Sequence, residues 1–330
     1  RLTFARRDNG ILCRVRVLML SKAMLVGAYQ RKLEEMAALP DVDLSVIVPP
    51  SWRDERGEMR LERAHLRGYR LIVSPIWFNG NFHLHFYPHL RRWLAETRPD
   101  LVHIDEEPYN FATFHAQTLA RRAGAKTLFF SWQNICRRYP FPFDWLERAV
   151  LRRADGALMG NAAALQVWRD KGYTGPAAVV PQVGVDPQLF IPADRPPAAG
   201  RGLVIGFAGR LVREKGADLL LEAARQVPGA AVRLAGSGPE QARLETLAAQ
   251  LGLRARVTFE SALPSAQMPA FYRSLDVLVA PSRTLPNWKE QFGRVLVEAM
   301  ACGVPVVGSD SGEIPAVIGD AGLIFPEGDA

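Results

Sequence analysis

Two segments in the second half of the chain combine glycine, cationic and carboxylate residues at spacings that suit a diphosphate. The first, 206–216, places Gly209 just after an apolar run, with Arg210 and Lys215 following it. If a strand ends before Gly209 and a helix begins near Gly216, the two cations lie beside a helix N-terminus, which favours anions. Taken alone, the same residues also fit a solvated charged loop.

The second segment, 290–307, carries two carboxylates eight residues apart. Glu290 lies in an expected loop, and Phe292 and Gly293 open an expected helix whose free N–H groups can bind a phosphate. Glu298 lies roughly 8 Å further along the helix axis. The two carboxylates could therefore reach the sugar and the ribose of one nucleoside diphosphate sugar. A plain amphipathic helix followed by a core strand explains the apolar positions but not this spacing.

The elements that must position these residues alternate along the chain. Short apolar runs are separated by amphipathic stretches of helical period, which is typical of a mostly parallel sheet covered on both faces. The expected strands are Val15–Leu20, Leu44–Val48, Arg70–Val73, Leu101–Ile104, Lys126–Phe130, Gly156–Met159, Ala178–Val180, Leu203–Ala208, Ala231–Ala235, Arg256–Phe259, Val277–Ala280, Val304–Gly308 and Leu323–Phe325. The expected helices include Tyr29–Leu39, Leu90–Glu96, Phe111–Ala123, Gly216–Gln226, Pro239–Leu251 and Gly293–Cys302.

A break in this rhythm divides the chain. The stretch 189–200 is rich in Pro, Ala and Gly, so we expect a linker there between a first domain, 1–188, and a second domain, 201–330. The fold class is α/β, with two Rossmann-like doubly wound domains facing across a cleft, where a ligand meets the carboxyl ends of both sheets. Because the chain stops soon after its last expected strand, we expect the closing helices of the second domain to be missing.

Composition excludes several classes of protein. The chain of 330 residues is 48% hydrophobic and 23% charged, and it has no apolar run long enough for a transmembrane helix. Its three cysteines are widely spaced, which argues against a disulfide framework or a zinc site. We therefore expect the reducing cytoplasm. The N-terminus lacks the apolar core of a signal peptide, and we interpret it as a trimmed end.

The net charge of +7 is concentrated in the first half. Residues 1–186 hold 27 Lys and Arg against 19 Asp and Glu, whereas residues 187–330 hold 14 against 15. Such a surplus suits an anionic partner, so we expect peripheral contact with an anionic membrane or an acidic acceptor. An arginine-rich surface without a partner is an equal alternative. Nucleic acid is not expected, because no recognisable motif accompanies the charge.

The motifs of the second half resemble those of glycosyltransferase family 4. Glu290 and Glu298 resemble its Glu-x7-Glu signature within the setting E-x-F-G-x4-E-A-M-A-x-G-x-P-V. The pair Gly209-Arg210, with Lys215 after it, resembles the diphosphate grip of that family.

Two further motifs extend the resemblance. Gly236-Ser237-Gly238-Pro239 is similar to the family's G-x-G-P loop, and 181–190 is similar to its crossover into the second domain. The resemblance covers about residues 180–325. It implies a GT-B fold, a retaining reaction, and donor contacts from Gly209, Gly236, Gly238, Phe292, Gly293 and Glu298.

The first domain resembles the family less closely. Members often carry a His just after the strand that corresponds to Lys126–Phe130, whereas this chain has Ser131-Trp132-Gln133-Asn134. Gln133 or Asn134 could instead hydrogen-bond an acceptor sugar. Glu106, with its acidic neighbour, could hold acceptor hydroxyls, although a solvated loop is the slightly favoured interpretation.

The histidines at 83 and 85 suggest a metal only at first sight. On a strand, His83 and His85 would share one face. Zinc would need further ligands at suitable spacing, which are not nearby. We favour an aromatic-lined acceptor cleft or ordinary core packing, and we interpret Asp41-Val42-Asp43 as turn residues. No metal and no other cofactor is therefore expected.

Together these residues predict a retaining glycosyltransferase that moves a sugar from a nucleoside diphosphate sugar to an acceptor hydroxyl without a metal. Arg210, Lys215 and Glu290 are the expected catalytic residues. The acceptor would be a glycan, a lipid-linked molecule or a small molecule. The alternative is a GT-B-type sugar-nucleotide epimerase or disaccharide phosphorylase. A non-catalytic two-domain binding protein is weaker, because it leaves the coincidence of these charged residues unexplained.

Overall fold

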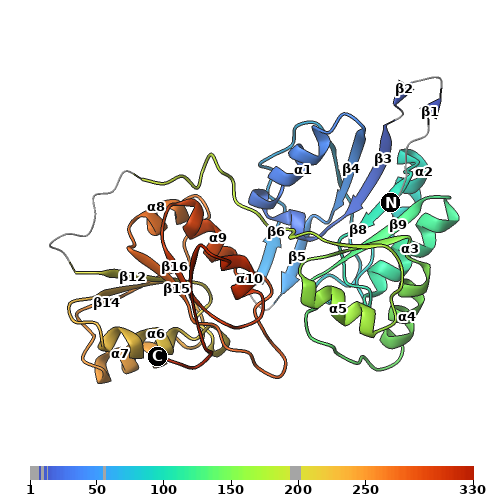
Figure 1. Cartoon of the computed structure of the whole chain (residues 1–330). Helices are drawn as coiled ribbons and strands as arrows, with labels where there is room; N and C mark the ends of the chain where they lie inside the picture. The colour runs from blue at the N-terminus through green and yellow to red at the C-terminus, as the bar shows by residue number, and fades with distance from the viewer. Residues whose placement is uncertain (1–6, 9–10, 13, 55–56, 194–201) are drawn as a thin grey trace. The chain divides into compact units, whose positions relative to one another are not determined.

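The computed structural model describes residues 7–8, 11–12, 14–54, 57–193 and 202–330, and it divides into two compact units, Arg1–Val180 and Pro181–Ala330 (Figure 1). Of the linker expected at 189–200, the residues from 194 onward lie outside the described part. Among the described residues, no helix is both long and apolar enough to span a membrane. Each unit is a doubly wound α/β domain, which confirms the predicted fold class.

The first unit is built on a seven-stranded parallel sheet in the order β11-β10-β9-β8-β3-β4-β7. Its strands are β3 (Val15–Leu20), β4 (Val42–Val48), β7 (Arg70–Val73), β8 (Leu101–Ile104), β9 (Lys126–Ser131), β10 (Gly156–Met159) and β11 (Ala177–Val179). Short antiparallel hairpins add β1 (Arg7–Asp8) with β2 (Ile11–Leu12), and β5 (Ser51–Asp54) with β6 (Gly57–Arg60). All seven expected strands of this half are confirmed to within two residues.

Alternate residues of the central strands pack into two different cores. Val17 and Met19 of β3 belong to the cluster beneath α1 (Arg31–Ala37), which also holds Leu33. Leu18 and Leu20 face the opposite core, which α2 and α3 cover. The helices on that side are α2 (Leu90–Thr97), α3 (Phe111–Arg122), α4 (Phe143–Arg153) and α5 (Ala162–Asp170). Two turns of 3₁₀ helix, η1 (Ala23–Leu25) and η2 (Gly27–Tyr29), lie between β3 and α1.

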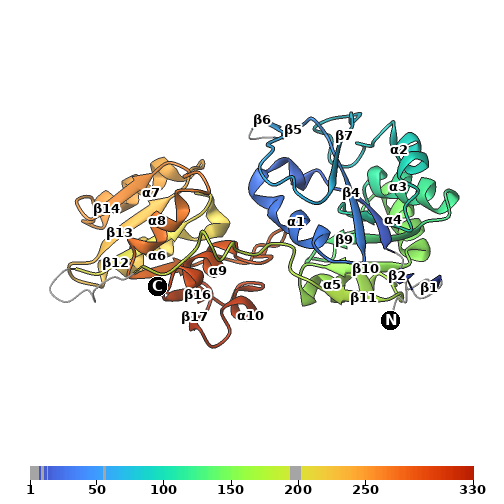
Figure 2. The same cartoon turned by 90° about the horizontal axis from the view of Figure 1, so that it is seen from above.

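The second unit repeats this architecture on a six-stranded parallel sheet in the order β14-β13-β12-β15-β16-β17. Its strands are β12 (Val204–Ala208), β13 (Ala231–Ala235), β14 (Val257–Glu260), β15 (Val277–Ala280), β16 (Val306–Ser309) and β17 (Gly322–Phe325). One core lies beneath α6 (Ala217–Arg225) and α7 (Gln241–Gln250). The other lies beneath α8 (Met268–Arg273), α9 (Arg294–Ala301) and α10 (Ile314–Ile318). Figure 2 shows these layers from above.

His83 and His85 do not lie on a strand. The segment 78–84 forms consecutive turns closed by a bridge between Trp77 and Phe86, so the two histidines do not alternate along a strand. The side-chain oxygen of Asn81 accepts hydrogen bonds from two following backbone N–H groups and competes with strand pairing. The period-two pattern of aromatic residues therefore reflects ring packing around a turn.

Strand order fixes where a ligand would bind in each sheet. In the first unit β4 lies on one side of β3 and β8 on the other, and in the second unit β13 and β15 flank β12 in the same way. At such a topological switch point the loops leave the carboxyl ends of two neighbouring strands in opposite directions and open a crevice. Ligand sites are therefore expected at the carboxyl ends of β3 and β8 in the first unit, and of β12 and β15 in the second.

Candidate functional site

At the switch point of the second unit, the loops that follow β12 and β13 lie backbone to backbone. Gly209 and Gly236 have φ angles of 152° and 154°, and a Cβ atom on Gly236 would lie 1.8 Å from the carbonyl oxygen of Gly209. A Cβ on Gly238 would lie 2.3 Å from the carbonyl oxygen of Leu211. Gly236 and Gly238 therefore occur where no side chain fits, and Gly209 has a φ that residues with side chains rarely adopt. Arg210, between these turns, is exposed.

Lys215 and Glu290, 75 residues apart in sequence, meet at this crevice. Nζ of Lys215 lies 2.5 Å from Oε2 of Glu290, and the hydroxyl of Ser282 donates to the same oxygen at 3.2 Å. Gly216, the N-cap of α6, has a φ of 68°, and a Cβ there would lie 1.9 Å from the carbonyl oxygen of Pro281. The loops after β12 and β15 thus touch at Gly216, and the ion pair lies where they meet.

The helix α9 begins beside this pair, as the sequence predicted. Its N-cap is Gly293, in the left-handed conformation at φ 79°, and Phe292 before it is half-buried. The aromatic ring of Trp288 lies 5.0 Å from Nζ of Lys215. A diphosphate at this point would meet a cation and the positive end of a helix dipole.

Glu298 lies one helical turn further on, and its carboxylate is already engaged. The residue is 4% exposed, the phenol of Tyr272 donates to its Oε2 at 2.6 Å, and the guanidinium of Arg294 lies 2.8 Å from its Oε1. Each carboxylate oxygen has two acceptor positions. A ribose hydroxyl could therefore be added to these contacts without displacing them.

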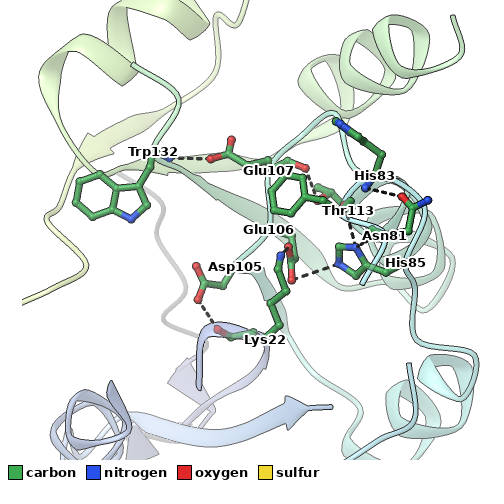
Figure 3. A network of polar contacts seen from close by, with 11 residues as sticks. Lys22, Asn81, His83, His85, Asp105, Glu106, Glu107, Thr113 and Trp132 are labelled. Atoms are coloured by element: carbon green, nitrogen blue, oxygen red, sulfur yellow. Dashed lines mark hydrogen bonds and ion pairs between the residues drawn. The ribbon is translucent and has the colours of Figure 1, made fainter. Parts of the chain in front are cut away.

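At the switch point of the first unit, three consecutive carboxylates follow β8 (Figure 3). They contact the chain that follows β3 on one side of β8 and β9 on the other. Asp105 accepts a 2.5 Å hydrogen bond from the hydroxyl of Ser21, and Glu106 pairs with Lys22, both in the loop after β3. On the other side, Glu107 accepts a 2.6 Å hydrogen bond from the hydroxyl of Ser131, the last residue of β9. It accepts a second, at 2.9 Å, from the backbone N–H of Trp132 in the loop that follows.

Glu106 is buried, so the expectation of a solvated loop at this position is wrong. The residue is 4% exposed, and its second oxygen lies 3.5 Å from Nε2 of His85, an ion pair whenever that ring is protonated. Burial alone would raise the pKa of the Glu106 carboxyl, but Lys22 and His85 outweigh it and hold that pKa at about 2. A paired, ionised carboxylate therefore lies at the crevice.

Glu107 behaves in the opposite way. Burial raises its pKa to about 7, and the hydrogen bonds from Ser131 and Trp132 offset that rise only in part. The carbonyl oxygen of Glu107 also accepts from the hydroxyl of Thr113 at 2.7 Å, which ties the loop to the first turn of α3. Adjacent carboxyl groups thus differ in charge state near neutral pH.

Gln133 and Asn134 are buried beside this network. The backbone N–H of Gln133 donates to the hydroxyl of Ser131 at 3.0 Å, and its side-chain amide donates to the carbonyl of Ile135. Its amide oxygen has no hydrogen-bond partner. Trp132 lies over Gly160 so closely that a Cβ on that glycine would meet the indole at 2.1 Å. The loop therefore has one fixed conformation, set by Glu107 and this packing.

Sequence reasoning missed Lys22, and it missed the contact between His85 and Glu106. The ammonium of Lys22 lies 4.6 Å from the ring centre of Phe82 and 5.4 Å from that of Trp52. His85 is fully buried, with Nδ1 2.9 Å from the carbonyl of Phe82. The position of Lys22, directly after the first central strand, is the signal that could have found it. Among the described residues, no three His, Cys, Asp or Glu side chains are placed to hold a metal ion.

Two family models match the chain, one in each unit. The model described as "Glycosyl transferase 4-like domain" matches residues 26–182, and the model described as "Glycosyl transferases group 1" matches residues 194–330. The D-inositol 3-phosphate glycosyltransferase of Mycobacterium tuberculosis is 37% identical over 281 residues, which is 80% of this chain and 52% of that protein. The protein of the same name from Mycobacteroides abscessus is 31% identical over 288 residues, 82% of this chain and 58% of that protein. The chain thus spans between half and three fifths of the length of these relatives.

Solved structures share the fold at low sequence identity. Sucrose-phosphate synthase from Thermosynechococcus elongatus matches with a TM-score of 0.68 and 20% identity over 96% of this chain and 87% of that one. The HepE protein of Anabaena in complex with UDP matches with a TM-score of 0.68 and 19% identity over 96% and 86%. These likenesses show two doubly wound domains of the GT-B type. With its two family models, the chain belongs to the group 1 glycosyltransferases.

Proposed function

We propose that the protein transfers a sugar from a nucleoside diphosphate sugar to an acceptor hydroxyl. The observation that carries this proposal is the 2.5 Å pair of Lys215 and Glu290 at the switch point of the second unit. Glycine turns bring the backbone close on one side of the pair, and the N-terminus of α9 lies on the other. This combination provides positive charge for a diphosphate and a carboxylate for the attached sugar.

The donor-side residues have distinct roles in this proposal. Arg210, Lys215 and the N–H groups at Phe292 and Gly293 would neutralise the diphosphate as it leaves, which makes the reaction independent of a metal. When Lys215 turns to the diphosphate, Glu290 is released to orient the donor sugar. The leaving phosphate would then assist attack on the same face, with retention of configuration. UDP and UDP-glucose occur in complexes of similarly folded proteins, which favours UDP sugars as the first donors to test.

The acceptor would bind at the switch point of the first unit. Glu106 and Lys22 offer a hydrogen-bond acceptor and a donor next to the exposed ring of Phe82. The proposed acceptor contacts are Glu106, Gln133 and Asn134, as expected from the sequence, and we add Lys22 to them. A hydroxyl-rich ring stacked on an aromatic face suits this set of groups. The proposed acceptors are a glycan, a lipid-linked molecule or a small molecule, and the relatives' name gives inositol phosphate as one to try.

We also propose an anionic membrane surface as a partner of the basic first unit, with the cytoplasm as the compartment. This part of the proposal rests on the charge of residues 1–186, where Lys and Arg exceed Asp and Glu by 27 to 19.

Replacing Lys215 tests the donor assignment. The Lys215→Ala variant should lower sugar transfer by on the order of 10²-fold or more, because it removes charge stabilisation at the leaving group. The matched control is Arg225→Ala, which removes an exposed cation of α6 far along the helix from its N-terminus. Unchanged transfer by the Lys215 variant would remove this residue from the mechanism.

Ligand binding tests the function as a whole. A nucleotide sugar present at 100 times its Kd should stabilise the protein by about 2.7 kcal/mol, which a thermal-shift screen of UDP, GDP, ADP and TDP sugars detects. The products then separate the alternatives. An epimerase leaves the sugar–diphosphate bond intact at equilibrium, and a phosphorylase requires inorganic phosphate. Absence of any shift, with no product from any donor, would contradict the proposal.

A further inference from the structure

A large apolar surface on the first unit has no part in the proposed transfer reaction. We call it the aromatic surface, and it consists of Trp77, Phe78, Phe86, Phe111, Phe114 and Trp145. Trp77 is 58% exposed, Phe78 is 60% exposed and Trp145 is 44% exposed. Singly exposed apolar residues need no explanation, but a contiguous group of them marks an interaction site.

Ring contacts make the aromatic surface continuous. The ring centres of Trp77 and Phe86 lie 5.5 Å apart, those of Phe86 and Phe111 lie 5.4 Å apart, and those of Phe114 and Trp145 lie 5.3 Å apart. Phe111 and Phe114 are stacked, with ring centres 6.5 Å apart, and this contact joins the group of Trp77, Phe86 and Phe111 to the pair of Phe114 and Trp145. The surface thus runs from the turn before α2, across α3, to the first turn of α4.

The helices that carry the aromatic surface, and α2 beside them, are also rich in arginine. The helices α2, α3 and α4, which lie side by side in both views (Figures 1 and 2), carry seven Arg against three Asp or Glu. On α4, Trp145, Arg148 and Arg152 are exposed and follow one another at spacings of three and four, so they form one stripe. The guanidinium of Arg153 lies 6.0 Å over the ring of Phe114. On α3 and α4, aromatic residues lie near the helix N-termini and arginines near the C-termini.

We propose that the aromatic surface and the arginines of α3 and α4 dock the protein on an anionic lipid membrane. Tryptophan and phenylalanine insert at the boundary between headgroups and acyl chains, while arginine side chains reach phosphates with their apolar stems lying along the surface. Each basic residue near an anionic leaflet adds attraction. A second copy of the chain is the poorer partner, because two arginine-rich layers would then face each other and repel.

This docking deepens the membrane part of the proposed function, and it does not depend on the transfer reaction. The turn that carries Trp77 and Phe78 also carries Phe82, whose ring lies over Lys22 at the acceptor-side switch point. The docked surface therefore adjoins the proposed acceptor contacts. An acceptor anchored in the membrane by a lipid would reach them without leaving the surface.

Vesicle sedimentation of the 330-residue chain tests the docking. Vesicles of phosphatidylglycerol mixed with phosphatidylcholine should bind the protein, and vesicles of phosphatidylcholine alone should bind it weakly. The double variant Arg122→Glu/Arg152→Glu should raise the apparent Kd for the mixed vesicles by at least about thirtyfold, since it removes and reverses two surface cations. Trp77→Ser/Trp145→Ser should weaken binding to the same vesicles and abolish the blue shift of tryptophan fluorescence that insertion causes.

The matched control is Arg225→Glu/Arg254→Glu, which makes the same charge change at exposed positions of the second unit. It should bind vesicles within about twofold of the unaltered chain, because these positions lie outside the proposed surface. An equal loss of vesicle binding in this control would overturn the proposal, because net charge alone would then explain the binding. Failure to bind the mixed vesicles, or a concentration-dependent dimer that the Trp variant abolishes, would also overturn it. A nucleotide thermal shift measured on each variant separates the two proposals: vesicle binding without any shift would refute the transferase and leave the docking standing.

Discussion

The two sheets share one topology, and each has a Lys–Glu ion pair at its switch point, but the pairs are held in different ways. In the second unit, glycine turns bring backbone against backbone, and Lys215 and Glu290 retain 26% and 11% side-chain exposure. In the first unit, side chains provide the contacts, and Glu106 is 1% exposed in its side chain. One site is built mainly from backbone around a partly exposed ion pair, whereas the other is built from charged side chains around a more deeply buried ion pair.

In the proposed reaction, this difference would separate donor binding from acceptor binding. A diphosphate is the same in every nucleotide sugar, and backbone turns with a helix N-terminus recognise it without reference to the base. Acceptors differ, and side chains such as Lys22, Glu106 and Gln133 can change with them. The backbone-built site therefore carries recognisable short motifs, whereas the side-chain-built site carries none, although a family model covers residues 26–182 of the first unit.

The largest expected difference between the two pairs lies in their contribution to stability. Lys22→Met leaves Glu106 buried without its cation, and it should lower the free energy of unfolding by about 3–5 kcal/mol. Lys215→Met should cost less than about 1 kcal/mol, because that pair is partly exposed. Urea denaturation measures both. The double variant Lys22→Met/Glu106→Gln should recover most of the loss, and equal losses from the two single lysine variants would show that the pairs do not differ.

The backbone contact of the second unit is tested by two glycines with nearly the same φ. Gly216 and Gly252 have φ angles of 68° and 71°, but only Gly216 lies against another backbone, at Pro281. Gly252→Ala should cost about 1 kcal/mol for the left-handed conformation alone. Gly216→Ala should cost about 3 kcal/mol, since the carbonyl of Pro281 must move, and should weaken the thermal shift by nucleotide. Equal costs would show that Gly216 is needed only for its φ.

The buried network of the first unit should also be visible in the pH dependence of stability. Glu107, with its pKa raised from 4.5 to about 7, binds a proton in the folded state that the unfolded chain has lost, so stability should fall as pH rises from about 4.5 to 7. The loss is at most about 3 kcal/mol. Glu106, with its pKa lowered to about 2, works in the opposite direction: its stabilisation is lost as pH falls from about 4.5 to 2.

Unfolding free energies of Glu107→Gln across this pH range measure the effect. Between pH 4.5 and 7, the unfolding free energy of the variant should change less with pH than that of the unaltered chain. Between pH 4.5 and 2, the two should depend on pH in the same way. A Glu107→Gln profile that still falls toward pH 7 would mean that another group titrates there.

Strands were the most predictable part of the fold. Arg70–Val73, Leu101–Ile104, Ala231–Ala235 and Val277–Ala280 have the bounds that the sequence indicated, because short apolar runs bounded by turn residues are typical of strands. The hairpin of β5 and β6 has no such signal, since its residues alternate polar and apolar only weakly. The segment 78–84 forms turns, and its alternating aromatic residues reflect ring packing between distant segments.

The donor side was predictable for a similar reason. Lys215 and Glu290 are 75 residues apart, but each lies in a local motif of glycines and a helix start that points to phosphate. Lys22 and Glu106 are 84 residues apart, and neither has a motif around it. Only the order of strands brings β3 beside β8, so the ion pair becomes visible after the sheet is known. Whether these residues bind the proposed ligands remains a prediction.

The three carboxylates at 105–107, at the start of the loop between β8 and α3, have a consequence for how this chain can vary. Asp105 and Glu106 contact the loop after β3, and Glu107 contacts the loop after β9, so one stretch of backbone sets the register of both. Inserting or deleting a single residue there would mismatch every one of these contacts together. Side-chain replacements, in contrast, alter them singly. Diversification of the proposed acceptor side should therefore proceed by substitution at fixed loop length, with insertions confined to connections outside 105–107.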